Sequence, residues 1–245
     1  MIIKALIIAF AMYSKIPMPK VDWDNRSMRY ALCFFPLIGV IIGGVVCFAG
    51  KALNGRSSLL YGSVMTVIPL LITGGIHFDG FLDTVDSLSS YGDRQKRLEI
   101  LKDPHIGAFA LIGGLIYMSL SIGLWSEVKT EDLIFISCGY VLSRALSALS
   151  VVILPKAKNE GLVSAFKDSA GRGGGIFTSV LYIVAAAFIM CRVGLHTALW
   201  VAVAAVIVFI YHIYNCKNNF GGITGDLAGY FLQLCELVIL AVAIV

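Results

Sequence analysis

Long apolar runs are the feature that most constrains how this chain can fold. Several stretches of about 20 residues are almost free of charge, and a helix of that length can cross the hydrocarbon core of a bilayer. Of the 245 residues, 58% are hydrophobic and 14% are charged. In a soluble globular domain roughly a quarter of the residues are charged. The sequence therefore predicts an integral membrane protein.

Seven runs are long enough to span a membrane, and a shorter apolar segment precedes them. The predicted spans are residues 30–50, 58–78, 106–125, 131–154, 176–193, 197–215 and 227–245. Residues 2–13 begin like a signal peptide, with Lys4 before an apolar run, but a small-residue cleavage site does not follow. We expect this segment to be retained as a short helix, either interfacial or spanning. The predicted fold is an all-α polytopic bundle that forms a single membrane domain over residues 1–245.

Lysine and arginine are concentrated in alternate connections between the predicted spans. Thirteen of them lie in the first, third, fifth and seventh connections, and four lie in the others. Connections rich in Lys and Arg stay on the cytoplasmic side, so we expect the Asp-rich loop and the loops 155–175 and 216–226 to face the cytoplasm. The net charge of +4 follows from this topology. The basic loops would attract a polyanionic substrate, and we expect no nucleic-acid partner.

Two further patterns are less informative. The six cysteines are scattered singly, without a CxxC pair or a Cys/His cluster, which disfavours both a zinc site and a disulfide framework. The glycine-rich stretch 171–175 lacks the Lys-Ser/Thr ending of a phosphate-binding P-loop, and we expect a flexible loop there.

An Asp-rich segment carries the clearest chemical signal. Asp79, Asp83 and Asp86 are spaced i, i+4 and i+7, which on a helix places three carboxylates within an arc of about 60°. Anions that lie so near to one another repel strongly, so a cation should lie between them. Ligation by carboxylates alone suits Mg²⁺, Mn²⁺ or Ca²⁺. The alternative is that these are ordinary solvated residues where a helix leaves the membrane.

A second pair of carboxylates follows in the next loop. Glu99 and Asp103 are again four residues apart. Two helical faces that carry carboxylates could complete a two-metal clamp, which would neutralise a diphosphate and activate an attacking hydroxyl.

Other candidate residues have two interpretations each. Gly225 and Asp226 lie before the last span, where the glycine permits close approach to a ligand and the aspartate either lines a site or caps the helix. Arg144, in the middle of a span, should meet either a carboxylate such as Glu236 or a substrate phosphate. His77 is explained by interfacial packing nearly as well as by substrate contact.

These motifs, taken in order, resemble those of a known family. They are Ser14 to Pro19, Phe35 to Gly39, Gly74 to Asp86, Arg97 to Asp103, Ser143-Arg144, and Gly221 to Asp226 followed by Glu236-Leu237. The chain resembles the cobalamin synthases (adenosylcobinamide-GDP ribazoletransferases), membrane enzymes of bacteria and archaea, over nearly its whole length. It departs from the family pattern at Leu82, Ser87, Pro104-His105 and Leu227. No role is carried over to Pro104, His105 or Leu227.

The resemblance implies a reaction and its partners. The family joins GDP-activated adenosylcobinamide to α-ribazole or its 5′-phosphate, releases GMP and requires Mg²⁺, in the cytoplasmic membrane with the active-site loops facing the cytoplasm. The lipid bilayer is a further partner. The sequence leaves open whether the chain associates with copies of itself or with other cobalamin-assembly enzymes.

The resemblance also suggests site roles. Predicted metal ligands are Asp79, Asp83, Asp86, Glu99 and Asp103. Asp83 and Asp103 are the predicted catalytic residues, with Asp103 as the general base. Predicted substrate contacts are Lys15, Lys102 and Arg144 to phosphates, Gly225 and Asp226 to the nucleotide or corrinoid, and His77.

Two other functions are compatible with the pattern. A CDP-alcohol phosphotransferase of phospholipid synthesis has a similar Asp signature. That signature requires Ala-Arg shortly after the Asp-Gly pair, where this chain has Asp83-Thr84. A cation-coupled or proton-coupled transporter also carries intramembrane carboxylates. It would place them near the midplane on broken helices, whereas these crowd one end of a span.

Overall fold

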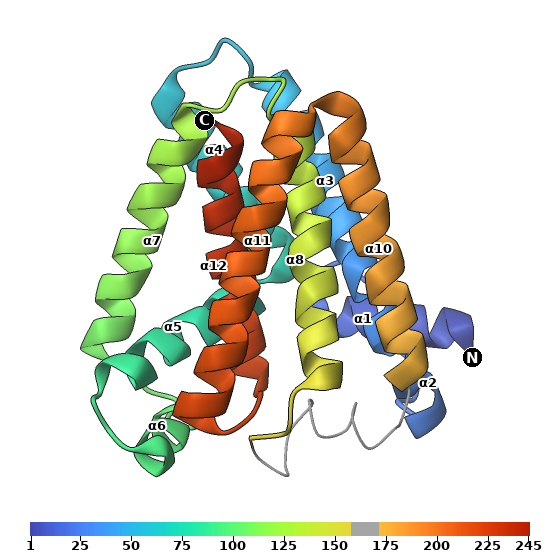
Figure 1. The fold of residues 1–245 in the computed structure, drawn as a ribbon, viewed down its shortest axis with the longest axis vertical. Helices are drawn as coiled ribbons and strands as arrows, with labels where there is room; N and C mark the ends of the chain where they lie inside the picture. Colours follow the sequence, from blue (N-terminus) through green and yellow to red (C-terminus); the bar gives the residue numbers. More distant parts are fainter. Residues whose placement is uncertain (158–171) are drawn as a thin grey trace.

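The computed structural model describes residues 1–157 and 172–245, and the chain in these ranges is almost entirely helical (Figure 1). The helices are α1 (Ile2–Tyr13), α2 (Asn25–Ala31), η1 (Leu32–Phe34), α3 (Phe35–Ala52), α4 (Ser58–Thr73), α5 (Ile76–Ser89), α6 (Arg94–Ile100), α7 (Ala108–Ser126), α8 (Leu133–Ile153), α10 (Arg172–Val193), α11 (Leu195–Asn215), η2 (Cys216–Phe220) and α12 (Gly225–Ala243). An isolated parallel bridge joins Lys156 to Ile223.

The number of membrane spans agrees with the sequence. Within the described residues, six helical stretches are long and apolar enough to cross a membrane, and α4 with α5 makes a seventh if that bent pair is counted as one span. These stretches match the predicted spans to within a few residues, except where α4 ends. The all-α polytopic bundle is therefore confirmed.

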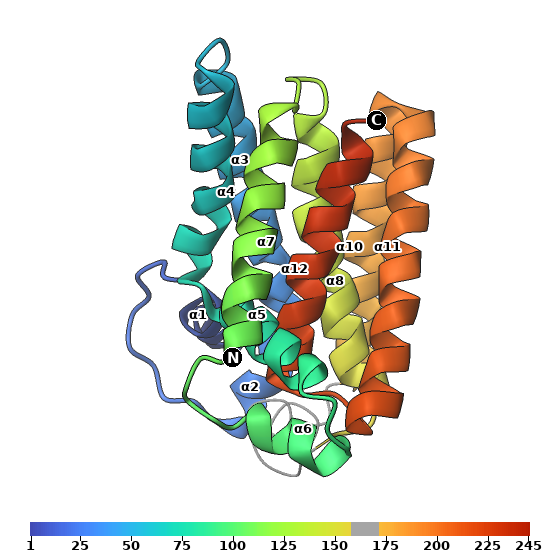
Figure 2. The same ribbon diagram turned by 90° about the vertical axis from the view of Figure 1, so that its left-hand side faces the viewer.

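Helix α8 forms the centre of the bundle. Of its apolar stretch, 83% is buried, against 22% for α7 and 17% for α10. Helices α3, α10, α11 and α12 all pack against it, as Figures 1 and 2 show from two directions. The outer helices instead expose large apolar side chains, among them Leu111 and Leu115 on α7 and Phe188 on α10. Such a surface suits contact with lipid, because lipid tails are as apolar as these side chains.

Basic connections gather at one end of the bundle. Helices α2, α6 and η2 lie together at that end, and the α3–α4 and α7–α8 connections lie at the other (Figure 2). This arrangement agrees with the alternation of basic connections along the chain. Lys158 and Lys167 fall outside the described residues.

The glycine-rich stretch differs from its prediction. Helix α10 begins at Arg172, so Gly173 to Gly175 are helical and the flexible loop predicted for them is wrong. Part of the reason is packing, since a Cβ on Gly175 would lie only 3.1 Å from the Val152 side chain on α8. Close packing on α8 offsets the low helix propensity of glycine. Gly171 lies outside the described residues.

Helix α1 lies across the bundle and does not run along it (Figures 1 and 2). Of the two predicted forms of the N-terminal segment, the structure therefore favours the interfacial one. Where α1 ends, the backbone N–H of Lys15 donates to the carbonyl of Ile72 at 2.8 Å. This bond holds the exit of α1 against the end of α4.

Candidate functional site

Two glycines separate the Asp-rich segment from the span before it. Gly74 and Gly75 have φ of 66° and 78°, in the left-handed region that glycine adopts most readily. The two helices on either side, α4 and α5, are bent by 100°. The prediction of one continuous span over residues 58–78 is therefore wrong at its C-terminal end. Helix α4 ends at Thr73, and the aspartates lie on a helix of their own.

Close backbone contact holds α5 against α12. A Cβ on Gly80 would lie 2.8 Å from the carbonyl oxygen of Asp226, and a Cβ on Gly229 would lie 2.8 Å from that of His77. Because glycine has no Cβ, the two backbones can touch at both points. The first turn of α12 is thereby placed beside Asp79, Asp83 and Asp86, which we call the Asp stripe.

The three aspartates of α5 lie in different surroundings. Asp79 is exposed, whereas Asp83 and Asp86 are half-buried. Asp86 Oδ1 accepts the backbone N–H of Ala110 at 3.3 Å, in the first turn of α7, where the helix dipole favours a negative charge. Asp86 therefore stabilises the start of α7, a role that its spacing in the sequence did not reveal.

Asp226 approaches the stripe from α12. The sequence left open whether Asp226 caps this helix, and the structure shows that Thr224 does so. The hydroxyl of Thr224 accepts the backbone N–H of Leu227 at 3.2 Å. Asp226 occupies the first turn and lines a cavity together with His77.

Carboxylates therefore gather around Asp83. Asp79, Asp226 and Asp86 all lie close enough to act electrostatically on its charge, and like charges repel more strongly where water is partly excluded. Even so, among the residues that the structure describes, no three His, Cys, Asp or Glu side chains are positioned to hold a metal ion. A metal site here would have to form by rotation of these side chains.

The predicted second half of the metal site, on and after α6, is engaged elsewhere. Glu99 Oε2 lies 3.7 Å from Lys96 Nζ. Asp103 Oδ1 accepts the backbone N–H of His105 at 3.0 Å and lies 2.6 Å from the His105 ring Nδ1. Hydrogen bonds from His105 lower the pKa of Asp103 below its usual value. His105, to which no role was carried over, is thus the partner of the predicted general base.

Lys102 lies in a cavity of about 480 Å³ on α6, together with Arg94 and Glu99. Asp79 lines two other cavities, and neither of them shares a lining residue with this one. Lys102 and Glu99 therefore do not line the cavities at Asp79.

Asp79 lies where two cavities meet. One cavity, of about 580 Å³, is lined by Lys15 among others, and the other, of about 160 Å³, is lined by His77, Gly225 and Asp226. Four of the predicted substrate contacts are thus arranged around one predicted metal ligand.

The chain path at the turn positions Lys15. A Cβ on Gly74 would lie 2.4 Å from Lys15 Cε, so the lysine side chain crosses the turn where only a glycine leaves room. Lys15 is exposed. Its ammonium group is therefore free to meet an anion that enters the larger cavity.

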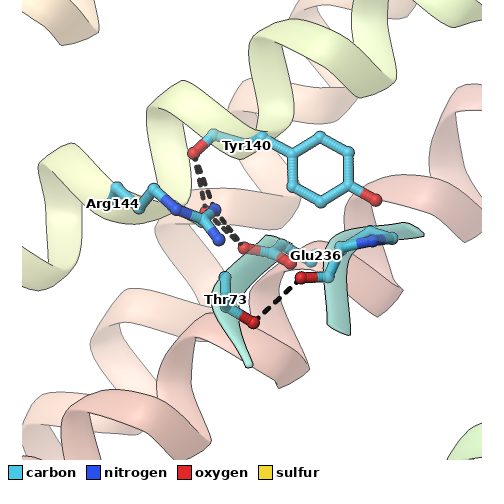
Figure 3. Close-up of polar contacts among 6 residues, drawn as sticks. Thr73, Tyr140, Arg144 and Glu236 are labelled. Carbon is cyan, nitrogen blue, oxygen red and sulfur yellow. Dashed lines mark hydrogen bonds and ion pairs between the residues drawn. The ribbon is translucent and has the colours of Figure 1, made fainter. Parts of the chain in front are cut away.

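Arg144, from the middle of α8, pairs with Glu236 of α12 (Figure 3). Their side chains are 1% and 8% exposed. The Ser143 hydroxyl donates to the same Glu236 oxygen at 2.9 Å, and Arg144 Nη1 donates to the Tyr140 carbonyl at 3.0 Å. Of the two partners that the sequence allowed, the structure shows the carboxylate. Arg144 lines neither cavity at Asp79.

The segment before α12 is anchored on both sides. The Ile223 N–H donates to the Pro155 carbonyl at 2.8 Å, and the Ala157 N–H donates to the Ile223 carbonyl at 3.2 Å. Gly221 has a φ of 69°, and a Cβ there would collide with the Arg94 guanidinium. These contacts fix where α12 begins, and hence the position of its first turn.

Known proteins resemble this chain over almost its full length. The family model described as cobalamin-5-phosphate synthase matches residues 5–244. An adenosylcobinamide-GDP ribazoletransferase of Lachnoclostridium phytofermentans is 45% identical over 237 residues, which cover 96% of this chain and 91% of the relative. Enzymes with the same name from Clostridium perfringens strain 13 and Treponema denticola are each 31% identical, covering 95% and 97% of this chain and 94% and 96% of the relatives. No solved structure matches the chain.

Proposed function

Because the chain belongs to the cobalamin-5-phosphate synthase family, we propose that its reaction takes place at the two cavities that meet at Asp79. Its activity is that of an adenosylcobinamide-GDP ribazoletransferase in cobalamin biosynthesis. The observation that carries the proposed location is that Asp79 lines both cavities, one with Lys15 and the other with His77 and Asp226.

The two substrates require two kinds of contact. A ribose hydroxyl of α-ribazole attacks the phosphorus that carries the cobinamide, the diphosphate bond to GMP breaks, and the hydroxyl proton passes to a base. Lys15 can meet the diphosphate from the larger cavity, because an ammonium group pairs well with phosphate oxygens. Asp79 and Asp226 can accept hydrogen bonds from the ribose hydroxyls.

Gly225 leaves room for a ligand at the first turn of α12. A Cβ added there would meet nothing within 4 Å, so the space in front of this residue is open. Backbone N–H groups in the first turn of a helix carry partial positive charge and suit an anionic or hydroxyl oxygen. The open space at Gly225 therefore favours the binding of a nucleoside at the mouth of the smaller cavity.

The carboxylates around Asp83 have the chemistry that a divalent cation such as Mg²⁺ requires, once their side chains rotate toward one another. Carboxylate oxygens are the ligands that Mg²⁺ prefers, and Asp79, Asp226 and Asp86 surround Asp83 closely enough that their negative charges repel it. Bound there, the cation would neutralise the diphosphate. We propose Asp79, Asp83 and Asp226 as its ligands, since Asp86 already contacts the start of α7.

Other predicted roles stay predictions. Helix α6 already contacts α5, where the Ser87 hydroxyl donates to the Arg97 carbonyl at 2.9 Å. Glu99 and Asp103 would therefore complete the metal site only if their own side chains turned toward Asp83. Lys102 lies in the cavity on α6, and Arg144 is engaged by Glu236. Asp83 and Asp103 remain the predicted catalytic carboxylates.

We also propose that the end of the bundle with α2, α6 and η2 faces the cytoplasm. The described basic connections lie at this end (Figure 2), and Lys and Arg near span ends favour the cytoplasmic side. Anionic nucleotide substrates would then reach Lys15 directly from the cytoplasm.

The proposal is tested by an assay of the protein in membranes or detergent. Adenosylcobinamide-GDP, α-ribazole 5′-phosphate and Mg²⁺ should give GMP and the cobalamin 5′-phosphate product. A Lys15→Ala variant of normal abundance should raise the KM for adenosylcobinamide-GDP. Wild-type kinetics for this variant would place the diphosphate outside the larger cavity.

A further inference from the structure

The smaller cavity at Asp79 has walls unlike those of an anion site. We call it the His77 cavity. Its lining includes the apolar or aromatic side chains of Tyr13, Phe35 and Leu232, the imidazole of His77 and the carboxylates of Asp79 and Asp226. An apolar lining with a few convergent polar groups is typical of sites that bind small organic molecules.

Three rings in this wall contact one another. The ring centroids of Tyr13 and Phe35 are 4.5 Å apart, and those of Phe35 and His77 are 5.6 Å apart. The His77 ring lies within 25° of parallel to that of Tyr13, at 6.0 Å. A wall of contacting rings suits a flat π-system, which gains from both stacked and edge-on contacts.

The volume of the cavity limits the ligand. A cavity of about 150 Å³ binds benzene, and the His77 cavity has about 160 Å³. A corrin macrocycle is far larger than this. A planar heterocyclic base is the part of either substrate that matches the cavity in size and shape.

His77 provides a polar atom for such a base. The residue is 5% exposed, and its Nε2 is buried without a hydrogen-bond partner among the described residues. Leaving a buried polar nitrogen unsatisfied is costly. A neutral imidazole nitrogen either donates or accepts one hydrogen bond, which matches a base with a single free ring nitrogen.

The position of the cavity connects it to the proposed reaction. His77 is buried and Asp79, two residues away, is exposed, so the cavity extends from the interior toward the surface. A base held at His77 would leave its ribose near Asp79 and Asp226. We propose that the His77 cavity binds the base of the ribazole substrate, with His77 Nε2 hydrogen-bonded to the free ring nitrogen and the ribose at the two carboxylates. This inference rests on the proposed function.

Guanine is the other planar base in the reaction. It presents several donors and acceptors along its edges, and each would need a partner once buried. The base of ribazole, a benzimidazole, presents one free ring nitrogen. The largely apolar wall therefore favours ribazole.

Two substitutions test the assignment. Ser147 lies in the cavity wall on α8 and is buried, so Ser147→Leu would partly fill the space. His77→Phe keeps an aromatic ring and removes the polar nitrogen, and it serves as the second variant if the first does not fold. The matched control is Ser119→Leu, on the exposed face of α7.

The measurements are steady-state GMP release with each substrate varied in turn, and calorimetric titration of α-ribazole into the detergent-solubilised protein, which needs no turnover. Each cavity variant should raise the KM for α-ribazole about tenfold or more and leave the KM for adenosylcobinamide-GDP within about twofold. The inference is overturned if only the second KM rises, which would place guanine in the cavity, or if neither changes. If wild-type protein released no GMP, the proposed function would be contradicted, whereas weaker calorimetric binding of α-ribazole to both cavity variants would still support the cavity assignment, and unchanged binding would overturn it.

Discussion

Arg144 on α8 and Glu236 on α12 form an ion pair inside the bundle (Figure 3), and the Ser143 hydroxyl donates to the Glu236 oxygen that Arg144 contacts. Charged side chains within a membrane domain are costly, and they are usually paired and face the bundle interior. The pair therefore explains how a span accommodates a guanidinium. It also holds α12, which carries Asp226, against the central helix.

Replacing one partner of this pair should destabilise the protein more than replacing both. Glu236→Leu leaves the Arg144 guanidinium buried without its carboxylate, and breaking a buried pair costs about 3 to 5 kcal/mol. In the double variant Arg144→Met with Glu236→Leu, both charges are absent, so most of that stability should return. Thermal unfolding in detergent measures the difference. A double variant that is no more stable than Glu236→Leu would show that the unpaired Arg144 charge is not what destabilises the single variant.

The same double variant tests the predicted phosphate contact of Arg144. If the guanidinium serves only the ion pair, a folded double variant should keep the wild-type KM for adenosylcobinamide-GDP. A clear rise in that KM would instead support contact between Arg144 and substrate.

Gly80→Ala should impair the transfer reaction by displacing α12. The new methyl group would lie 2.8 Å from the Asp226 carbonyl oxygen, so α5 and α12 would have to separate. A displacement of about 1 Å in a reacting group can cost about a hundredfold in rate. We expect a loss of that order in kcat/KM, measured by GMP release at equal protein abundance.

The control for this substitution is Gly123→Ala on α7, where an added Cβ would meet nothing within 4 Å. That variant should keep its activity. Unchanged transfer in Gly80→Ala would show that the reaction does not depend on close contact between α5 and α12.

The spans could be predicted from sequence because apolar length is a local property of the chain. Helices α7, α8 and α11 lie within a few residues of their predicted ranges. The hydropathy pattern could not reveal the bend at Gly74-Gly75, because two glycines within an apolar run barely lower its mean hydropathy. The signal was their adjacency, since consecutive glycines often mark a turn.

The site depends on contacts that are distant in sequence. Asp226 meets the Asp stripe because Gly80 and Gly229 let two helices touch, and no local pattern encodes that pairing. The hydrogen bond from His105 to Asp103 was within reach of sequence reasoning, because an aspartate commonly accepts the N–H two residues on. The family resemblance does not indicate it, because His105 departs from the family pattern.

Asp83→Asn should abolish most of the transfer activity. The substitution keeps the shape of the side chain and removes the charge at the centre of the carboxylate group. Loss of one preorganised electrostatic contact in an active site costs about a hundredfold to a thousandfold in kcat. Conversion of adenosylcobinamide-GDP to the cobalamin product, measured in membranes of matched abundance, should fall by that order.

Asp22→Asn provides the matched control, because Asp22 is an exposed carboxylate in the segment before α2. It should retain full conversion. Wild-type conversion by Asp83→Asn would refute the assignment of the Asp stripe to the reaction.

Metal dependence should distinguish the two proposed halves of the metal site. Chelation by EDTA should stop GMP release, and Mg²⁺ should restore it. Asp226→Asn removes a proposed ligand and should raise the Mg²⁺ concentration for half-maximal rate about tenfold or more, since even residues that only orient ligands contribute that much to metal affinity. Glu99→Gln should shift it far less, because Glu99 pairs with Lys96 on α6. An equal shift in both variants would support the predicted role of Glu99 as a metal ligand.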